Sequence, residues 1–237
     1  ALAISFAHRH SVSLWARDPE KAARMQAAGE NSRYLPGHRF PVSLRATADF
    51  SAASQNAELM IIAAPLAGLR TALQYLRDAG VATPFLWVCK GLEKGTGLLP
   101  HQVVREVLGE RLCGVLTGPS FADELARDLP TVVTIASTDA NFALRCAEAL
   151  RGPRLRIYAS DDVIGAEVGG AVKNVMAIAT GVCDGLGLGM NARAALMTRG
   201  LHEIARFGKA LGGHADTFMG LSGMGDLFLT CTGDLSR

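Results

Sequence analysis

The sequence predicts an α/β protein, in which a doubly wound, mostly parallel sheet is followed by an all-α region. Short apolar runs alternate with amphipathic segments in the first part of the chain, and this order is typical of buried parallel strands covered by helices on both faces. After residue 160 the strand pattern ends and long helical segments follow. We therefore predict a domain boundary near residue 160, with one domain over 1–160 and a second over 161–237.

The predicted strands are short apolar runs, and each is followed by polar, proline or glycine residues. They cover 11–16, 58–64, 84–89, 112–117, 131–136 and 155–159. The predicted helices cover 19–29, 66–80, 100–109, 121–129, 141–151, 163–185 and 191–211. The phrase that opens the chain, 1–4, is also typical of a helix.

Composition excludes several classes of protein. Hydrophobic residues make up 49% of the chain and charged residues 19%, which excludes a disordered polymer. The net charge of +2 comes from basic residues interspersed with acids, so no nucleic-acid partner is predicted. The most apolar stretch, 163–190, is interrupted by Glu167, Lys173, Asn174 and Asp184, so no membrane span is predicted.

The cysteines and histidines show no metal-binding pattern. The 5 cysteines are widely spaced, without a C-x-x-C pair, which is typical of reduced thiols in a cytoplasmic protein. The 6 histidines have neither metal-ligand nor catalytic-triad spacing. We therefore predict a cytoplasmic location and no metal site.

Candidate site residues follow two of the predicted strands, because ligands of open α/β sheets bind at the carboxyl ends of the strands. Lys90 follows 84–89, where it could reach an anion or a polarised carbonyl, although on its own this position is more typical of a surface lysine that closes the strand. Gly118 and Ser120 lie in a turn after 112–117. The helix after this turn could bind a phosphate at its N-terminus, or simply be an ordinary capped helix.

The strongest anomaly is Lys173 and Asn174, a polar pair inside an apolar helical phrase that begins with Gly169 and Gly170. Glycines inside a helix let another backbone or a ligand approach closely, and removal of a lysine from water lowers its pKa toward a value useful for proton transfer. The alternative is a packed glycine pair with the lysine reaching to solvent. Asp226 is the next candidate, either as a helix N-cap or as an acid that orients a lysine or a substrate hydroxyl.

Five phrases in the same order resemble those of bacterial NAD(P)-dependent glycerol-3-phosphate dehydrogenase, and they extend over the whole chain. They are WVCKGLE at 87–93, TGPSFA at 117–122, GGAVKNV at 169–175, NARAAL at 191–196 and GMGDL at 223–227. The resemblance implies a Rossmann-type domain followed by a helical substrate domain. It also implies hydride transfer between NADP or NAD and glycerol 3-phosphate or dihydroxyacetone phosphate, which supplies glycerol 3-phosphate for phospholipid synthesis.

The resemblance assigns roles residue by residue. Lys173 matches the family's proton acceptor, Asp226 the acid beside it, and Lys90 a lysine that contacts substrate and cofactor. The implied substrate-binding residues are Lys90, Gly118, Ser120, Lys173, Asn174, Asp226, Ser236 and Arg237. The implied cofactor-binding residues are Arg17, Lys90, Ala122 and Arg237.

The chain departs from the family pattern at both ends. The family's first strand and Gly-x-Gly-x-x-Gly turn, which hold the pyrophosphate, are absent before residue 1, and the chain stops at Arg237 before the asparagine of the Ser-Arg-Asn phrase. We therefore expect both domains to be incomplete in this chain. Arg17 follows the strand 11–16, where an arginine accommodates a 2′-phosphate, so we expect NADP to be accepted at least as well as NAD.

Two other functions stay open at this point. One is a related two-domain reductase that acts on a different hydroxy acid and needs no substrate phosphate. The other is a non-catalytic nucleotide-binding protein, whose expected signature is loss of the catalytic lysine. The expected partner is a small-molecule substrate, and a homodimer is compatible with the resemblance.

Overall fold

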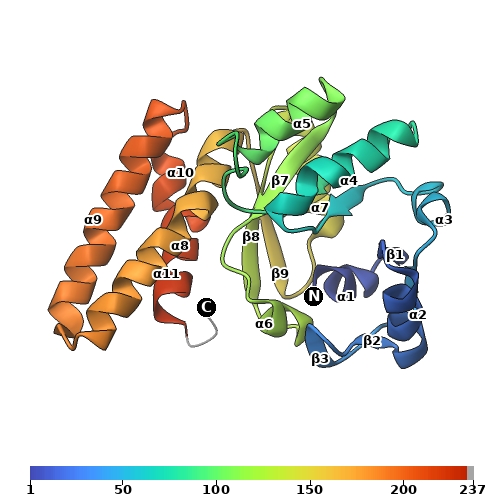
Figure 1. Cartoon of the computed structure of the whole chain (residues 1–237), viewed down its shortest axis with the longest axis horizontal. Coiled ribbons are helices and arrows are strands. Elements are labelled where there is room, and N and C mark those ends of the chain that lie inside the picture. Colours follow the sequence, from blue (N-terminus) through green and yellow to red (C-terminus); the bar gives the residue numbers. More distant parts are fainter. Residues whose placement is uncertain (234–237) are drawn as a thin grey trace.

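The computed structural model describes residues 1–233, in which an α/β region is followed by helices. Figure 1 shows α8 to α11 at one end of the molecule, the main sheet in the centre, and α1, α2 and β1 to β3 at the other end. The alternation of strands and helices ends with β9, and the described residues beyond it contain only helices. The predicted order of an α/β region followed by an all-α region is therefore confirmed.

The main sheet has the strand order β5-β6-β7-β8-β9. All neighbours are parallel except β7 and β8, which are antiparallel. This exception arises because the link between them holds only a short helix and does not cross the sheet, so β8 starts at the edge where β7 ends. The bounds are β5 (Met60–Ile62), β6 (Phe85–Trp87), β7 (Cys113–Thr117), β8 (Thr131–Ala136) and β9 (Leu155–Ser160).

Both faces of the main sheet are covered, as the near-continuous apolar strands predict. Phe85 and Trp87 of β6 pack on one face, together with residues of α4, α5 and the start of α8. Leu86, between them in the sequence, packs on the other face with residues of α1, α6 and α7. Alternate side chains of one strand therefore enter two cores, as expected for a buried central strand.

The first strands lie outside this sheet. β1 (Val12–Trp15) pairs in parallel with β4 (Leu44–Thr47), and β2 (Glu30–Asn31) pairs with β3 (Leu35–Arg39) in an antiparallel hairpin. Within the described residues, neither pair shares a ladder with the main sheet. The predicted strand over 11–16 is therefore present as β1 but pairs outside the main sheet, and β2, β3 and β4 were not predicted.

The helices of the α/β region mostly match their predicted ranges, and several begin at an aspartate N-cap. Asp18, Asp49 and Asp139 each accept backbone N–H groups at the start of α2, α3 and α7. The helix predicted over 121–129 is shorter than expected, because Asp128 adopts a left-handed φ of 56°. The bounds are α1 (Leu2–Ala7), α2 (Pro19–Ala28), α3 (Phe50–Ser54), α4 (Leu66–Asp78), α5 (Pro100–Leu108), α6 (Ala122–Ala126) and α7 (Ala140–Leu150).

The helical region is built around two long helices, both predicted from the sequence. Leu201 and Ile204 of the second pack against Val168 of the first, in a core that also holds Phe218 and Leu227. The short helices that follow and the π-helical turn were not predicted. The bounds are α8 (Val163–Gly185), α9 (Gly189–Ala210), α10 (Ala215–Met219), the π-helical turn η1 (Leu221–Gly225) and α11 (Asp226–Thr232).

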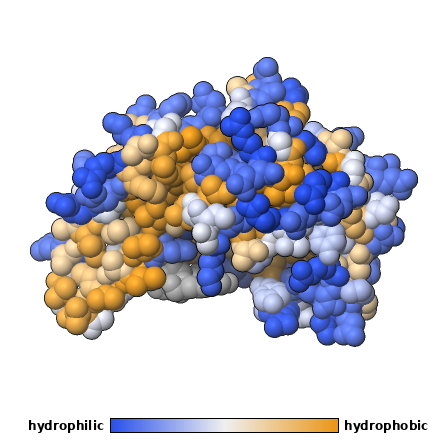
Figure 2. Space-filling model, turned by 45° about the horizontal axis from the view of Figure 1, so that its top comes forward, coloured by the Kyte–Doolittle hydropathy of each residue, from blue (hydrophilic) through white to orange (hydrophobic). Residues whose placement is uncertain are grey.

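Helix α8 is long and apolar enough, by length and composition, to cross a membrane, and among the described residues it is the one helix that meets this test. Its window of highest hydropathy is 44% buried inside the protein, and it carries Glu167 and Lys173 in polar contacts with other elements. This burial and these polar contacts are typical of a helix in the core of a protein. Figure 2 shows apolar side chains gathered at the end of the molecule where α8 and α9 lie, and Ile178, Val182 and Met190 are exposed there.

Candidate active site

Three charged side chains from distant parts of the chain meet where the main sheet contacts the helical region. Lys173 comes from α8, Asp226 is the first residue of α11, and Lys90 follows β6. The Nζ atom of Lys173 lies 2.6 Å from Oδ1 of Asp226. The ammonium of Lys90 donates to Oδ2 of the same carboxylate. The structure therefore brings together the three residues that the sequence singled out as catalytic.

The carboxyl edge of the sheet supplies the next part of the site. Because β6 and β7 run parallel, with Trp87 opposite Val115, the residues after both strands leave the same edge. The Nζ atom of Lys90 lies 3.4 Å from the carbonyl oxygen of Gly118, and Oγ of Ser120 donates to that oxygen at 3.3 Å. Gly118 therefore lies beside Lys90, and the hydroxyl of Ser120 shares the same carbonyl oxygen.

The backbone at Gly118 requires glycine. Its φ of +134° lies in a region that L residues rarely adopt, and a Cβ atom built there would lie 3.1 Å from Cα of Val133. The turn can therefore stay close to β8 while its carbonyl oxygen points to Lys90.

The glycine pair of α8 allows two close approaches. A Cβ atom on Gly169 would lie 2.2 Å from the carbonyl oxygen of Ser222, so the backbone of η1 packs directly on α8. A Cβ atom on Gly170 would lie 3.0 Å from Cδ of Lys90, so the stem of that lysine passes over the helix. The prediction that these glycines let neighbouring groups approach the helix is confirmed.

Asp226 does not cap a helix. The N-cap position of α11 is Gly225, and the carboxylate of Asp226 points instead to the two lysines. The π-helical turn η1 directly precedes Asp226, and such turns often occur at functional sites. Of the two sequence interpretations, the N-cap is therefore wrong, and the contact with the two lysines is compatible with the other, an acid that orients a lysine.

Burial sets the electrostatics of this cluster. The side chain of Asp226 is 2% exposed, that of Lys173 15% and that of Lys90 25%. The pKa of the Lys90 ammonium is lowered, first because burial disfavours its charge and second because the Lys173 ammonium is near, while Asp226 opposes both effects. One carboxylate therefore faces two amino groups, and burial favours release of the proton of Lys90.

Other predicted residues lie apart from this cluster or outside the described residues. Asn174 is exposed on α8. Arg17 is exposed between β1 and α2, and Ala122 is exposed at the start of α6, with no contact in the described part of the chain that links either to the lysines. Ser236 and Arg237 lie outside the described residues.

The sequence missed two acidic residues that form hydrogen bonds near the site. Glu167 appears in the sequence only as an interruption of an apolar stretch, yet the residue is 4% exposed and its carboxylate accepts from Trp87. Glu93 follows Lys90 closely and pairs with Arg70 of α4 through two hydrogen bonds of 2.9 and 2.8 Å. A carboxylate inside an apolar helical phrase is the same kind of anomaly as Lys173, and this signal could have identified Glu167.

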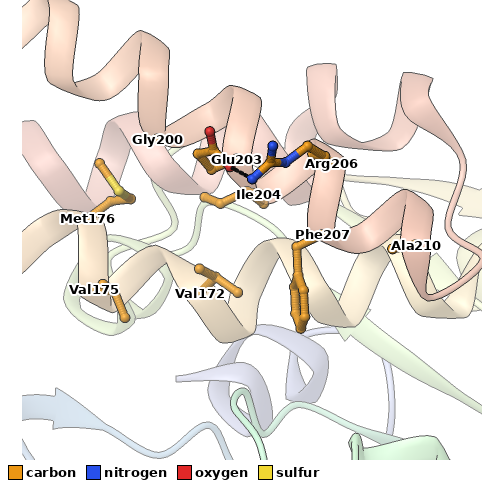
Figure 3. A pocket seen from close by; sticks show the side chains of 9 residues that line it. All are labelled: Val172, Val175, Met176, Gly200, Glu203, Ile204, Arg206, Phe207 and Ala210. Atoms are coloured by element: carbon orange, nitrogen blue, oxygen red, sulfur yellow. Dashed lines mark ion pairs between the residues drawn. The ribbon is translucent and has the colours of Figure 1, made fainter.

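A separate hollow of about 490 Å³ lies between α8 and α9. Figure 3 shows that apolar side chains line it, with the Glu203–Arg206 ion pair on α9 as its charged feature. Within residues 1–233, none of the residues predicted for the site lines this hollow. No group of histidine, cysteine, aspartate and glutamate in the described residues could hold a metal ion.

The chemistry of the site fits an anionic dinucleotide beside a phosphorylated substrate. Two ammonium groups, a serine hydroxyl and the turn at Gly118 meet at the carboxyl edge of β6 and β7, where open α/β sheets bind such ligands. Arg17 adds a cation at the carboxyl end of β1. These donors suit phosphate oxygens and a developing alkoxide.

Comparisons with known proteins show the family of this chain. The family model described as NAD-dependent glycerol-3-phosphate dehydrogenase N-terminus matches residues 1–143, and the corresponding C-terminus model matches residues 162–237. A glycerol-3-phosphate dehydrogenase [NAD(P)+] of Dechloromonas aromatica is 58% identical over all of this chain and 72% of its own length. A relative of the same name from Aromatoleum aromaticum is 60% identical, with 73% of its length covered.

A solved structure of a glycerol-3-phosphate dehydrogenase is also similar to this chain. The crystal structure of glycerol-3-phosphate dehydrogenase from Coxiella burnetii superimposes with a TM-score of 0.93 and 42% sequence identity, over all of this chain and 73% of that one. The chain thus spans somewhat less than three quarters of the length of these relatives. Together, the family models, the relatives and this structure show that the chain belongs to the NAD-dependent glycerol-3-phosphate dehydrogenase family.

Proposed function

We propose that this chain interconverts glycerol 3-phosphate and dihydroxyacetone phosphate with NADP or NAD, as the names of its relatives indicate for those proteins. Residues 1–160 would form the dinucleotide-binding domain and 161–237 the first part of the substrate domain. The observation that carries this proposal is the buried carboxylate of Asp226 between Lys173 and Lys90 at the carboxyl edge of the sheet.

Lys173 is proposed as the proton acceptor. In its neutral form, Nζ of Lys173 takes the proton from the C2 hydroxyl of glycerol 3-phosphate, and in the reverse direction its ammonium protonates the developing alkoxide. Asp226 holds Nζ in place at 2.6 Å. The bound nicotinamide supplies the hydride acceptor or donor. Lys90, on the other oxygen of Asp226, stabilises negative charge on the substrate oxygen.

The remaining predicted residues would bind the two ligands. Gly118, Ser120 and Asn174 are proposed to contact the substrate, and Ser236 and Arg237 to bind its phosphate, for which the planar guanidinium is well suited. The proposed cofactor-binding residues are Arg17, Lys90, Ala122 and Arg237. Because Arg17 suits a 2′-phosphate, NADP is expected to be used at least as well as NAD.

Activity on matched substrates tests this function. The wild-type protein is assayed with glycerol 3-phosphate, with glycerol and with a panel of 2-hydroxy acids, each with NADP and NAD. Turnover of glycerol 3-phosphate alone is expected. Turnover of a hydroxy acid without phosphate would favour the related reductase, and cofactor binding without turnover of any substrate would favour a non-catalytic nucleotide-binding protein.

The cellular setting is also proposed. The product would supply phospholipid synthesis, the protein would be cytoplasmic, and it would act as a homodimer. Light scattering of the purified protein tests the dimer, and a monomeric mass would contradict it. Depletion of the protein should make growth dependent on added glycerol 3-phosphate if it supplies lipid synthesis.

A further inference from the structure

Glu167 is a buried carboxylate to which the proposed reaction assigns no role. It lies on α8, 6 residues before Lys173, and is 4% exposed. Its Oε1 accepts from the indole Nε1 of Trp87 and from the backbone N–H of His101, both at 2.9 Å. Its Oε2 lies 2.5 Å from Nδ1 of the His101 ring. Both carboxylate oxygens therefore have hydrogen-bond partners, and these partners lie far from Glu167 in the sequence.

These partners link Glu167 to the backbone that carries Lys90. Trp87 is the last residue of β6 and precedes Lys90 by 3 residues. His101 lies in the first turn of α5, which packs on the same face of the sheet. Glu167 thus connects the helix of Lys173 directly to the strand that leads to Lys90.

A contribution to folding stability does not explain why a carboxylate is buried at this position. Burial raises the pKa of Glu167, and the hydrogen bonds from His101 and Trp87 oppose that shift only in part. An apolar side chain of similar size often replaces a buried ionic group without loss of stability, because it requires no desolvation of charge. A buried carboxylate with directional partners specifies one arrangement of the two elements instead.

The site tolerates little movement of α8. The stem of Lys90 passes over Gly170, where a Cβ atom would lie 3.0 Å from its Cδ, so only glycine leaves room for the lysine at this position of α8. Lys173 reaches Asp226 at 2.6 Å, and a displacement of about 1 Å would exceed hydrogen-bond distance. The relative position of α8 and β6 therefore decides whether both lysines reach the same carboxylate.

We propose that Glu167 is a positioning residue: its hydrogen bonds to Trp87 and His101 hold α8 against β6 so that Lys173 and Lys90 both engage Asp226. This inference rests on the proposed function. Glu167 touches no reacting atom, and its effect on the reaction passes through the two lysines.

Two pairs of variants of the full-length protein test this role. Glu167→Met removes all three hydrogen bonds at similar volume, whereas Glu167→Gln keeps an oxygen acceptor for the two N–H groups. His101→Ala removes the ring contact of a side chain that is 28% exposed, whereas His101→Asn retains a donor near the position of Nδ1. Phe142→Leu, in the core below the other face of the sheet, controls for a general loss of stability.

The measurements separate positioning from folding. We expect Glu167→Met to lower kcat about 10-fold to 100-fold, because a small misplacement of catalytic groups typically has an effect of this size. The Kd of the cofactor and the KM of glycerol 3-phosphate should stay within about 3-fold of wild type. The deuterium isotope effect on kcat, with substrate deuterated at C2, should rise because hydride transfer becomes slower. Glu167→Gln and His101→Asn should each recover most of the kcat lost in the paired variant.

The same measurements show whether the positioning role or the proposed function is wrong. If both Glu167→Met and His101→Ala keep the wild-type kcat and isotope effect, or only lower the melting temperature as Phe142→Leu does, the positioning role is overturned. If Glu167→Met does not fold, His101→Ala and His101→Asn decide the question by the same criteria. A wild-type protein that does not turn over glycerol 3-phosphate would overturn the proposed function itself, and this inference with it.

Discussion

Lys173 and Asp226, 53 residues apart in the sequence, lie in direct contact, with Nζ 2.6 Å from Oδ1. The carboxylate is almost completely buried and the amino group is 15% exposed, so the contact is sheltered from water on one side and open to a ligand on the other. A sheltered acid can hold an amine in one orientation while the amine exchanges a proton with a substrate.

This contact predicts the effect of Lys173→Ala. Turnover of glycerol 3-phosphate should fall by at least about 100-fold, because general acid–base catalysis contributes roughly that much or more. Cofactor binding, measured by fluorescence titration, should stay close to wild type. Lys209→Ala, at the exposed end of α9, is the matched control and should keep full activity. Near-normal turnover by Lys173→Ala would refute the assignment of the proton acceptor.

Asp226→Asn should reduce both stability and turnover, because it leaves two amino groups beside a neutral amide. Removal of one partner from a buried charge cluster costs about 3 kcal/mol in unfolding free energy near neutral pH. Loss of the carboxylate lowers the folded-state pKa of Lys90 further below its ordinary value of 10.5. The folded state then binds fewer protons than the unfolded state, so the stability of the variant should recover as pH rises toward 10.5.

Urea unfolding of wild type and Asp226→Asn at pH 7 and pH 9.5, about 1 unit below the ordinary lysine value, checks this prediction. The difference in unfolding free energy should be smaller at the higher pH. A difference that stays constant or grows with pH would show that the carboxylate does not offset buried lysine charge.

Two glycines of α8 provide a matched pair of substitutions. Gly169→Ala should destabilise the protein, because the new Cβ atom would lie 2.2 Å from the backbone oxygen of Ser222. Gly181→Ala should stabilise it by about 0.5–1 kcal/mol, because its Cβ atom would meet no atom within 4 Å and alanine favours a helix. Thermal unfolding of both variants checks the pair. Equal effects at the two positions would mean that η1 does not pack on Gly169 as described.

The sequence predicted the strands and helices where the hydrophobic pattern was strong, and failed where it was weak. Strand β3 was missed because it contains proline and glycine and buries only Leu35. Strand β4 was missed because it is short and alternates buried and exposed residues over only four positions. These strands form through pairing with a partner, which a pattern along the chain does not reveal.

The spacing of residues along the chain could not predict which residues far apart in the sequence would contact each other. Lys90 and Asp226 are 136 residues apart, and family resemblance rather than periodicity placed them in one site. The partners of Glu167 were also unpredictable, because Trp87 and His101 reach it only through the packing of α8 on the sheet. Single anomalous residues were visible in the sequence, whereas their partners depended on the fold.

Glu93 should stabilise the loop after Lys90 in a pH-dependent way. The guanidinium of Arg70 and the hydroxyl of Thr96 lower the pKa of Glu93 from its ordinary value of 4.5 to about 2. The pair therefore contributes its full stabilisation above pH 4.5 and loses it as pH falls toward 2. Glu93→Gln should cost ~1 kcal/mol at pH 7, near the upper value for partly exposed ion pairs.

Urea unfolding from pH 7 to pH 2.5, within about half a unit of the lowered pKa, tests this dependence. The stability difference between wild type and Glu93→Gln should shrink as pH falls. Glu106→Gln is the control, because it removes the second partner of Arg70 but keeps both hydrogen bonds to Glu93. A difference that does not change with pH would contradict the pairing.

Arg17 provides a test of cofactor choice that is independent of the lysine cluster. It is exposed after β1, and its guanidinium could bind a 2′-phosphate through two oxygens. Arg17→Asp should raise the KM for NADP about 10-fold or more, since one charge-assisted pair is replaced by repulsion, and should leave kcat and the KM for NAD nearly unchanged. Arg24→Asp on the exposed part of α2 makes the same charge change and should leave both KM values unaltered.

Steady-state kinetics with each cofactor distinguish the two variants. A strong preference of the wild type for NAD, or equal effects of both substitutions, would show that Arg17 does not contact the 2′-phosphate.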